Sequence, residues 1–296
     1  MDRSNNKVAV FILLGQSNAV GHGLYMKEED KIHVPLQNVF GLSRAFNQSY
    51  DHGTLSWSNY TSHGMNLAEE QDDTYSVANC LAKLWQDEID SGNECLLPDL
   101  YVVHIAIGAQ GVTGQNMWNP DREKTLIPGK LGVVDISLYP FTVHILSLVK
   151  ESISKLGKTP EIFGLHWRGG EQELEAPKEL LETSLTEIYD TIFDGFYKAL
   201  DETCPTVLHK IVCHERCMES DPSGKRLENM HYINDVFKAC SEKRENITVF
   251  DVRHAPQFAP DARGNGIFCD DLVHFTKETN QWVAGEILSQ YKKNYL

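Results

Sequence analysis

The chain lacks long apolar runs and is poor in basic residues. No stretch of its 296 residues reaches about 18 consecutive apolar positions, the length that a membrane-spanning helix needs. Lys and Arg number 27 against 42 Asp and Glu, so the formal net charge is −15. Because an acidic surface repels nucleic acid and anionic membranes, we expect neither as a partner. Neutral small molecules and glycans remain compatible with this charge.

The sequence also lacks an ordered cysteine framework. Its seven cysteines are odd in number and irregularly spaced, which argues against a set of disulfides. Cys213 and Cys217, with His209 and His214 nearby, could form half of a metal site. No second pair completes a tetrahedral set, so we favour buried thiols at a strand end and expect no metal.

A signal peptide is not evident at the N-terminus. Arg3 and Lys7 precede an apolar run, but the run is short and no small-residue cleavage site follows. We interpret the run as the first strand and favour a cytoplasmic location. The sequons at Asn47, Asn59 and Asn246 keep secretion open, as does a signal peptide removed before position 1.

Apolar residues make up 41% of the chain, which is enough for a sizeable core. Five apolar runs predict strands, and their continuous apolarity is typical of a parallel sheet covered on both faces. These runs are Val8–Leu14, Leu100–Ile107, Glu161–Trp167, Leu208–His214 and Ile247–Val252. Helical periodicity lies between or after them at 76–89, 141–156, 179–200 and 277–296, with Thr276 as the N-cap of the last helix. The pattern predicts an α/β fold, a three-layer α/β/α sandwich with a five-stranded parallel sheet.

No repeat, low-complexity tract or linker divides the chain, so we expect one domain over residues 1–296. Residues 21–74 differ from the rest, because they are polar and aromatic without a clear period. Loops of that length in a compact domain are usually functional. Ligands of such folds bind beyond the carboxyl ends of the strands, and Ser17 comes directly after the first strand.

A carboxylate and an imidazole stand three positions apart near the C-terminus, at Asp271 and His274. On a turn, the carboxylate can accept the Nδ1 proton of the imidazole and leave Nε2 free as a base. A serine hydroxyl needs such a base, because it is a weak nucleophile alone. The same spacing also occurs in ordinary surface turns whose carboxylate caps a helix.

Four blocks together resemble the SGNH/GDSL-like hydrolases, and among them the family 6 carbohydrate esterases and sialate O-acetylesterases. Gly-Gln-Ser-Asn at 15–18 follows the first strand, and Asp-x-x-His at 271–274 precedes the last helix. "IAIGAQGVTGQNMW" (105–118) follows the second strand, and "HWRGGEQE" (166–173) ends the third. The resemblance implies a flavodoxin-like sandwich and no cofactor. It also implies removal of acetyl or other small acyl groups from a carbohydrate.

The resemblance implies a role for each residue of the triad. Ser17 is the nucleophile, His274 the general base and then acid, and Asp271 the orienting carboxylate. Asp270 is the alternative acid, one residue out of register. Ser17 would attack the ester carbonyl to form an acyl-enzyme that water then hydrolyses.

Backbone donors are expected to form an oxyanion hole. The Ser17 N–H is one, and a glycine of the second block is another, because glycine allows a close approach. We take Gly111 first and Gly108 second. Either glycine is also explained by an ordinary turn.

The third oxyanion donor is missing from its family position. Aligning the third block puts Gly169 where the family has glutamine, which predicts an empty volume there. Gln110 or Arg168 would replace the lost donor, and we favour Gln110. The residues expected to support the site are Gln16, Asn18, Glu171 and Arg168.

Two other functions stay open. Gly169 suggests a glycan-binding or catalytically degenerate module, and the superfamily also contains lipid esterases and thioesterases. Loop aromatic and polar residues could contact a sugar ring or simply pack locally. They are Trp57, Tyr60, His63, Trp118 and Asn119.

Overall fold

The computed structural model describes residues 6–44, 54–69, 74–92, 97–122, 128–129, 132–133 and 137–296. Its main sheet contains seven strands in the order β3-β2-β4-β1-β7-β8-β9. They are β1 (Lys7–Gly15), β2 (Val39–Leu42), β3 (Trp57–Asn59), β4 (Leu100–Ala106), β7 (Thr159–Arg168), β8 (Thr206–His209) and β9 (Ile247–Phe250). A separate two-stranded ribbon joins β5 (Pro128–Gly129) to β6 (Gly132–Val133).

Neighbouring strands of the main sheet are parallel except at one edge, where β3 runs antiparallel to β2. The five strands predicted from sequence stand in the order second, first, third, fourth, fifth. This is the flavodoxin-like order, and the α/β class is confirmed. The strand count was too low, because the segment 21–74 contributes β2 and β3. The fourth strand also ends at His209, before the expected His214.

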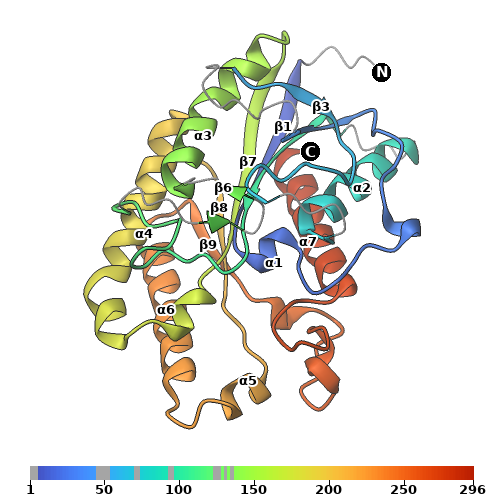
Figure 1. Cartoon of the computed structure of the whole chain (residues 1–296). Helices are drawn as coiled ribbons and strands as arrows, with labels where there is room; N and C mark the ends of the chain where they lie inside the picture. The colour runs from blue at the N-terminus through green and yellow to red at the C-terminus, as the bar shows by residue number, and fades with distance from the viewer. Residues whose placement is uncertain are drawn as a thin grey trace.

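Helices cover both faces of the sheet (Figure 1). One layer holds α3 (Leu138–Ser154), α4 (Lys178–Leu200) and α6 (Lys225–Lys243), and the other holds α2 (Val77–Asp90) and α7 (Lys277–Tyr295). Two short helices, α1 (Ser17–Val20) and α5 (Glu215–Glu219), follow β1 and β8. Short 3-10 turns are η1 (Glu28–Asp30), η3 (Gln172–Glu175), η4 (Val252–His254) and η5 (Arg263–Gly266).

The central strand β1 is apolar throughout because both of its faces are covered. Its residues alternate between two core clusters. Even-numbered residues Val8 to Leu14 pack with side chains of α3, α4 and α6. Odd-numbered residues Ala9 to Leu13 pack with side chains of α2 and α7. The prediction of strands buried on both faces is therefore confirmed for β1, β4 and β8. It is wrong for β9, where only Ile247 is fully buried and Thr248 is exposed.

The predicted helices α2, α3, α4 and α7 are present, and the hydroxyl of Thr276 caps α7 by accepting the backbone N–H of Thr279. Helix α6 was not predicted from the sequence. Its buried apolar residues, Ile233, Val236, Phe237 and Cys240, occupy only its second half, so its periodicity is weak.

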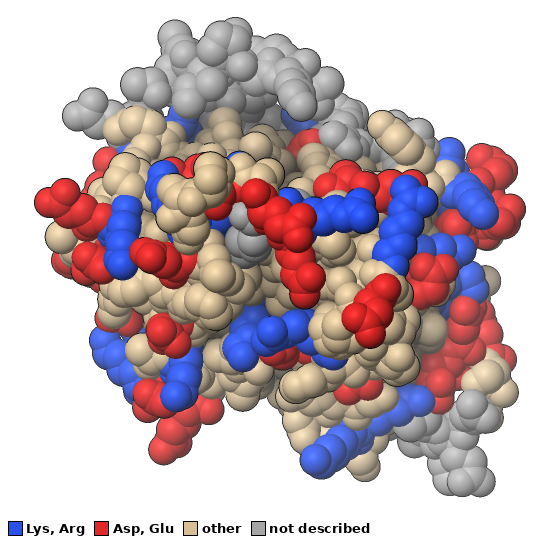
Figure 2. Space-filling view, turned by 90° about the horizontal axis from the view of Figure 1, so that it is seen from below, with Lys and Arg blue, Asp and Glu red and all other residues tan. Residues whose placement is uncertain are grey.

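The carboxyl ends of β1, β4 and β7 reach the same level. Gly15 pairs with Ala106 on one side and with Arg168 on the other. The loops that follow these strands therefore meet at one end of the molecule, the lower end in Figure 1, where α1 follows β1. Acidic and basic side chains are interspersed on this end (Figure 2).

Within the ranges that the structure describes, no helix combines the length and apolarity needed to cross a lipid bilayer. The sequon at Asn47 and the cysteine at position 95 lie outside the described residues. Five other cysteines are free thiols, at positions 80, 204, 213, 240 and 269.

Candidate active site

Ser17 lies in a tight turn at the carboxyl end of β1. Gly15 ends the strand with a φ of +142°, and a Cβ there would lie 2.0 Å from the carbonyl oxygen of Arg168. Only glycine can occupy this position, because both the backbone conformation and the close approach exclude a side chain. Ser17 follows as the first residue of α1 and is partly exposed. The turn thus presents the hydroxyl of Ser17 at the carboxyl end of the central strand.

Asp271 and His274 contact one another in the turn before α7. The Nδ1 of His274 lies 2.7 Å from Oδ2 of Asp271. The other oxygen of Asp271 accepts the backbone N–H groups of Val273 and His274, both at 3.0 Å. Partial burial opposes ionisation of Asp271, but these bonds outweigh it and hold its pKa below the usual value. The predicted carboxylate–imidazole contact is confirmed. Asp270 instead pairs with Arg263 in solvent, at 3.1 Å.

The amide of Asn18 joins the turn of Ser17 to the turn of His274. Its oxygen accepts the N–H of Phe275 at 3.3 Å, and its nitrogen donates to the carbonyl of Val273 at 3.4 Å. It also donates to Glu171 Oε1 at 2.9 Å. Asn18 therefore bonds to the residues on both sides of His274. Two motifs from opposite ends of the chain are held together by one side chain.

Ser17 and His274 stand on adjoining turns without a direct hydrogen bond. Gly23 packs so tightly on the histidine that a Cβ there would lie 2.4 Å from His274 Cβ. Among the described residues, no hydrogen bond joins Ser17 Oγ to His274, although the sequence led us to expect one. Such nucleophile–base contacts are often longer without substrate and tighten in the reacting complex.

The side chain of Gln16 connects three strand ends. Its Oε1 accepts the N–H groups of Gly170, Glu171 and Gln172 at 3.1 to 3.4 Å. Its Nε2 donates to the carbonyl of Gln110 at 2.5 Å. Gln16 also takes up space beside Gly169, because a Cβ at that glycine would lie 3.3 Å from Gln16 Cγ. The first atom of a side chain at Gly169 would therefore contact the Gln16 stem, and the empty volume farther out, where an amide would sit, stays a prediction.

The loop after β4 is fixed by two carboxylates that the sequence did not single out. Glu69 Oε2 accepts the N–H of Gly108 at 2.7 Å, so this N–H is already engaged. Glu173 is fully buried and accepts the N–H of Val112 at 2.7 Å. Burial raises the pKa of Glu173, although its hydrogen bonds oppose this.

The backbone of Gly111 packs directly against the carboxylate of Glu173, and its N–H has no partner among the described residues. A Cβ at Gly111 would lie 1.9 Å from Glu173 Oε1, so a side chain cannot be accommodated. Within the described part of the chain, the N–H of Gly111 makes no hydrogen bond, in contrast to that of Gly108. Of the two candidate glycines, Gly108 has an N–H that is already engaged, whereas that of Gly111 has no partner among the described residues.

The two proposed replacements for the missing glutamine lie in different surroundings. Gln110 is partly exposed, and its Oε1 accepts the N–H of Met117 at 3.1 Å, which leaves Nε2 to donate elsewhere. Arg168 is buried and donates to Asn280 of α7 at 3.0 Å. Its guanidinium lies 5.1 Å from the ring centre of Phe275. Burial lowers the pKa of Arg168 to about 10, while Glu171 opposes the shift. Arg168 therefore points into the α7 layer, beneath the histidine turn.

A second imidazole lies beside His274. The ring centres of His22 and His274 are 5.6 Å apart, with the rings at 70°. His22 Nε2 contacts Glu69 Oε1 at 3.0 Å. His22 and Glu69 both come from the segment 21–74. The sequence predicted that this segment is functional but singled out neither residue.

Most of the loop aromatic residues pack into the protein. Tyr60 and Trp118 are fully buried. Trp118 donates to the carbonyl of Gly15 at 3.2 Å and therefore supports the nucleophile turn from below. Trp57 donates to Ser152 at 2.9 Å, and only His63 of this group is exposed. Asn119 donates to the carbonyl of Gly114. For Tyr60 and Trp118 the sugar-stacking alternative is excluded by burial.

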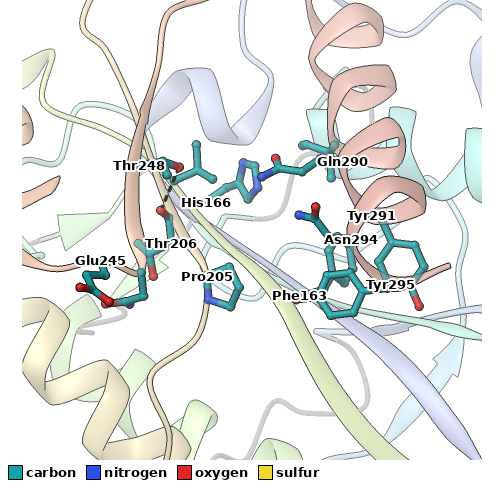
Figure 3. A pocket seen from close by; sticks show the side chains of 13 residues that line it. Phe163, His166, Pro205, Thr206, Glu245, Thr248, Gln290, Tyr291, Asn294 and Tyr295 are labelled. Carbon is teal, nitrogen blue, oxygen red and sulfur yellow. Dashed lines mark hydrogen bonds between the residues drawn. The ribbon is translucent and has the colours of Figure 1, made fainter.

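A cavity of about 190 Å³ lies elsewhere, between α7 and strands β7 to β9 (Figure 3). None of the candidate site residues lines it. The imidazole of His166 points into the cavity toward Gln290. Its Nδ1 lies 3.0 Å from Nε2 of His209. Across the described ranges, no cluster of three His, Cys, Asp or Glu residues is arranged to hold a metal ion.

No protein-family model matches the chain, and no curated protein matches its sequence. Among solved structures, the fold is similar to that of NanS, with a TM-score of 0.63, 15% identity, and coverage of 99% of this chain and 100% of NanS. The chain also aligns with an aryl esterase from M. smegmatis (TM-score 0.46, 10% identity, 97% and 99% coverage). A family two carbohydrate esterase from Clostridium thermocellum aligns with a TM-score of 0.47, 11% identity, and 98% and 65% coverage. The similarity to NanS extends over the whole chain and shows a shared fold, in agreement with the α/β sandwich predicted from the sequence.

Proposed function

We propose that the protein is a serine esterase that removes acetyl or other small acyl groups from a carbohydrate. One observation carries the proposal: Asn18 joins the Ser17 turn to the turn in which Asp271 holds the Nδ1 edge of His274. The fold shared with NanS supports it. The acetyl group and the carbohydrate come from the motif resemblance, and the neutral substrate suits the acidic chain.

The reaction follows from the roles of three side chains. His274 Nε2 takes the proton of Ser17 as Oγ attacks the ester carbonyl. Asp271 accepts the Nδ1 proton and stabilises the imidazolium that forms. His274 then protonates the leaving alcohol, which leaves an acyl group on Ser17. Water attacks this acyl-enzyme with His274 again as the base, and the carboxylic acid is released.

The negative charge of the tetrahedral intermediate needs donors in fixed positions. We assign the N–H groups of Ser17 and Gly111 to this role, with the Gln110 Nε2 as the third donor. Gly108 is not assigned, because its N–H donates to Glu69. Gln16 and Glu171 support the arrangement by fixing the loops around Ser17.

A chromogenic acetyl ester tests the proposal directly. Wild type is expected to hydrolyse it, and Ser17→Ala is expected to fall to the uncatalysed rate. Ser147→Ala is the matched control, because that serine is exposed on α3 and bonds only within its helix. Equal rates for wild type and Ser17→Ala would refute the esterase. A comparison of acetylated xylan, acetylated sialic acid and simple acetyl esters then identifies the substrate.

Gly169 favours one alternative, a glycan-binding module without useful turnover. The glycine removes a donor amide that the family has at this position, and losing one such donor typically costs a hundred- to a thousand-fold in rate, roughly. The alternative predicts glycan binding that Ser17→Ala leaves intact, together with no ester hydrolysis above background.

We propose a cytoplasmic location, because the five cysteines that the structure describes are free thiols. Free thiols persist where the surroundings are reducing. Microscopy of the full chain fused to a fluorescent protein tests this location directly. Detection of the protein in the culture medium would contradict it.

A further inference from the structure

The rim of the candidate site holds a second imidazole–carboxylate pair, His22 with Glu69. The side chains of the two residues are 22% and 12% exposed, so the pair is largely shielded from water. His22 lies on the same turn as the nucleophile, because its backbone N–H donates to the carbonyl of Ser17 at 3.0 Å. The ring of His22 contacts the ring of His274 edge-on. The reaction described above uses neither His22 nor Glu69.

Glu69 has a contact on each side. One oxygen contacts His22 Nε2 at 3.0 Å, and the other accepts the N–H of Gly108 at 2.7 Å. Gly108 begins the loop that carries Gln110 and Gly111. The carboxylate therefore connects the turn of the nucleophile to the loop of the oxyanion donors.

Gly108 also fits the imidazole sterically. A Cβ at Gly108 would lie 2.6 Å from Cε1 of His22, so the loop backbone rests directly on the ring. Gly108 does not have the left-handed backbone conformation that favours glycine. The glycine is needed there for space, which indicates that ring, carboxylate and loop form one packed unit.

We propose that Glu69 is a positioning residue of the esterase reaction. Through His22 and Gly108 it holds the Gly111 N–H and the Gln110 amide at a fixed place relative to Ser17. The inference rests on the proposed function, because it concerns the geometry of that same site. Positional errors of about 1 Å in such donors are enough to cost on the order of a hundred-fold in rate.

The test compares Glu69→Ala with Glu69→Gln on a chromogenic acetyl ester. Glu69→Ala removes both contacts and is expected to lower kcat by about ten- to a hundred-fold with KM nearly unchanged, because the donors act mainly in the transition state. Glu69→Gln can keep both contacts, since its amide oxygen accepts from Gly108 and its nitrogen donates to His22. We expect it to recover most of the lost kcat.

A spectroscopic measurement separates this role from general stability. A carboxylate can only accept, so we expect Nε2 of His22 to donate to Glu69 in wild type, whereas in Glu69→Gln the same nitrogen must accept from the amide. Histidine ¹⁵N NMR should therefore show that Nε2 of His22 loses its proton in the Gln variant. The matched control is Glu28→Ala, which breaks an exposed contact of 2.9 Å with His33 in the same segment and should leave kcat unchanged.

Each outcome decides the proposal. A kcat within two-fold of wild type in Glu69→Ala would overturn it, as would a loss that Gln does not restore. If Glu69→Ala does not fold, Glu69→Gln decides alone: retained kcat with the lost Nε2 proton supports the role, and a kcat below about a tenth overturns it. Wild type that is no faster than Ser17→Ala would overturn the esterase itself, whereas an active wild type with a fully active Glu69→Ala overturns only the role of Glu69.

Discussion

Among the residues that the structure describes, the pairs His22–His274 and His166–His209 are in ring contact, and their surroundings differ. At the rim, His22 and His274 each contact a carboxylate, Glu69 and Asp271. Inside, His166 and His209 contact one another and no carboxylate among the described residues. Burial and the charge of Arg168 lower the pKa of His166 to about 3 and that of His209 well below its usual value. An imidazole that must exchange protons needs a carboxylate and water nearby, whereas a buried pair stays neutral and fills space.

The largest loss of kcat is expected when His274 of the pair His22–His274 is replaced. His274→Ala should lower kcat by more than about a thousand-fold, because Ser17 loses its base, while the unfolding temperature changes little. His209→Ala should do the reverse, since it opens a cavity in the core and leaves His166 without its partner. Ester hydrolysis and thermal unfolding of both variants test the contrast. An inactive, fully stable His209→Ala would contradict it.

The neighbouring carboxylates Asp270 and Asp271 allow a second comparison, because only Asp271 contacts His274. Asp271→Asn should lower kcat by about a hundred- to ten-thousand-fold, because the imidazole loses the acceptor that fixes its tautomer. Asp270→Asn is the control, since Asp270 pairs only with exposed Arg263 in the described structure and should leave kcat unchanged. Equal losses in the two variants would show that the acid has been assigned to the wrong residue.

A smaller effect is expected at the oxyanion loop. Gln110→Ala should lower kcat by about ten- to a hundred-fold with KM nearly constant, since its amide acts in the transition state. Adding Gly169→Gln should restore part of the loss. The rescue is expected to stay partial, because a side chain at 169 starts 3.3 Å from Gln16 Cγ and must displace it. An unchanged kcat in Gln110→Ala would refute the replacement.

The last effect concerns stability in mild acid rather than activity. His166 and His209 are neutral in the folded state, and His104, whose pKa burial lowers to about 4, behaves likewise. The unfolded chain takes up these protons below about pH 6.5, so stability is full above that pH and falls on acidification, by up to about 1.4 kcal/mol per pH unit for each histidine. Denaturant unfolding at pH 7, 6 and 5 measures the slope. A flat profile would contradict the assignment of neutral buried imidazoles.

The sequence predicted the parallel strands and the two motifs of the candidate site because both are local patterns. Continuous apolar runs predicted β1, β4 and β7, and the Asp271–His274 contact needs only a turn. Helix α6 and strands β2 and β3 escaped prediction because their patterns are short or weak. Glu69 and Glu173 escaped for another reason. A carboxylate that binds a loop 39 to 61 positions away leaves no local trace in the sequence.

The same reasoning applies to the surroundings of Gly169. A sequence alignment treats a glycine in place of glutamine as a loss of volume at that position. In the fold, the stem of Gln16 lies against the glycine, from a residue far away in the chain. Whether a missing side chain leaves a hole depends on its spatial neighbours, which the alignment does not contain.

The bond between Asn18 and Phe275 spans 257 positions, and it has a consequence for how the protein is made. A ribosome delivers the turn of Ser17 long before the turn of His274. Contacts of such sequence separation form slowly, because the intervening chain must first be ordered. Until α7 docks, Ala9, Phe11 and Leu13 of β1 lack one of the two helices that cover them. A chain cut short before α7 would thus expose part of the apolar centre of its sheet, which makes it a target for chaperones and for aggregation.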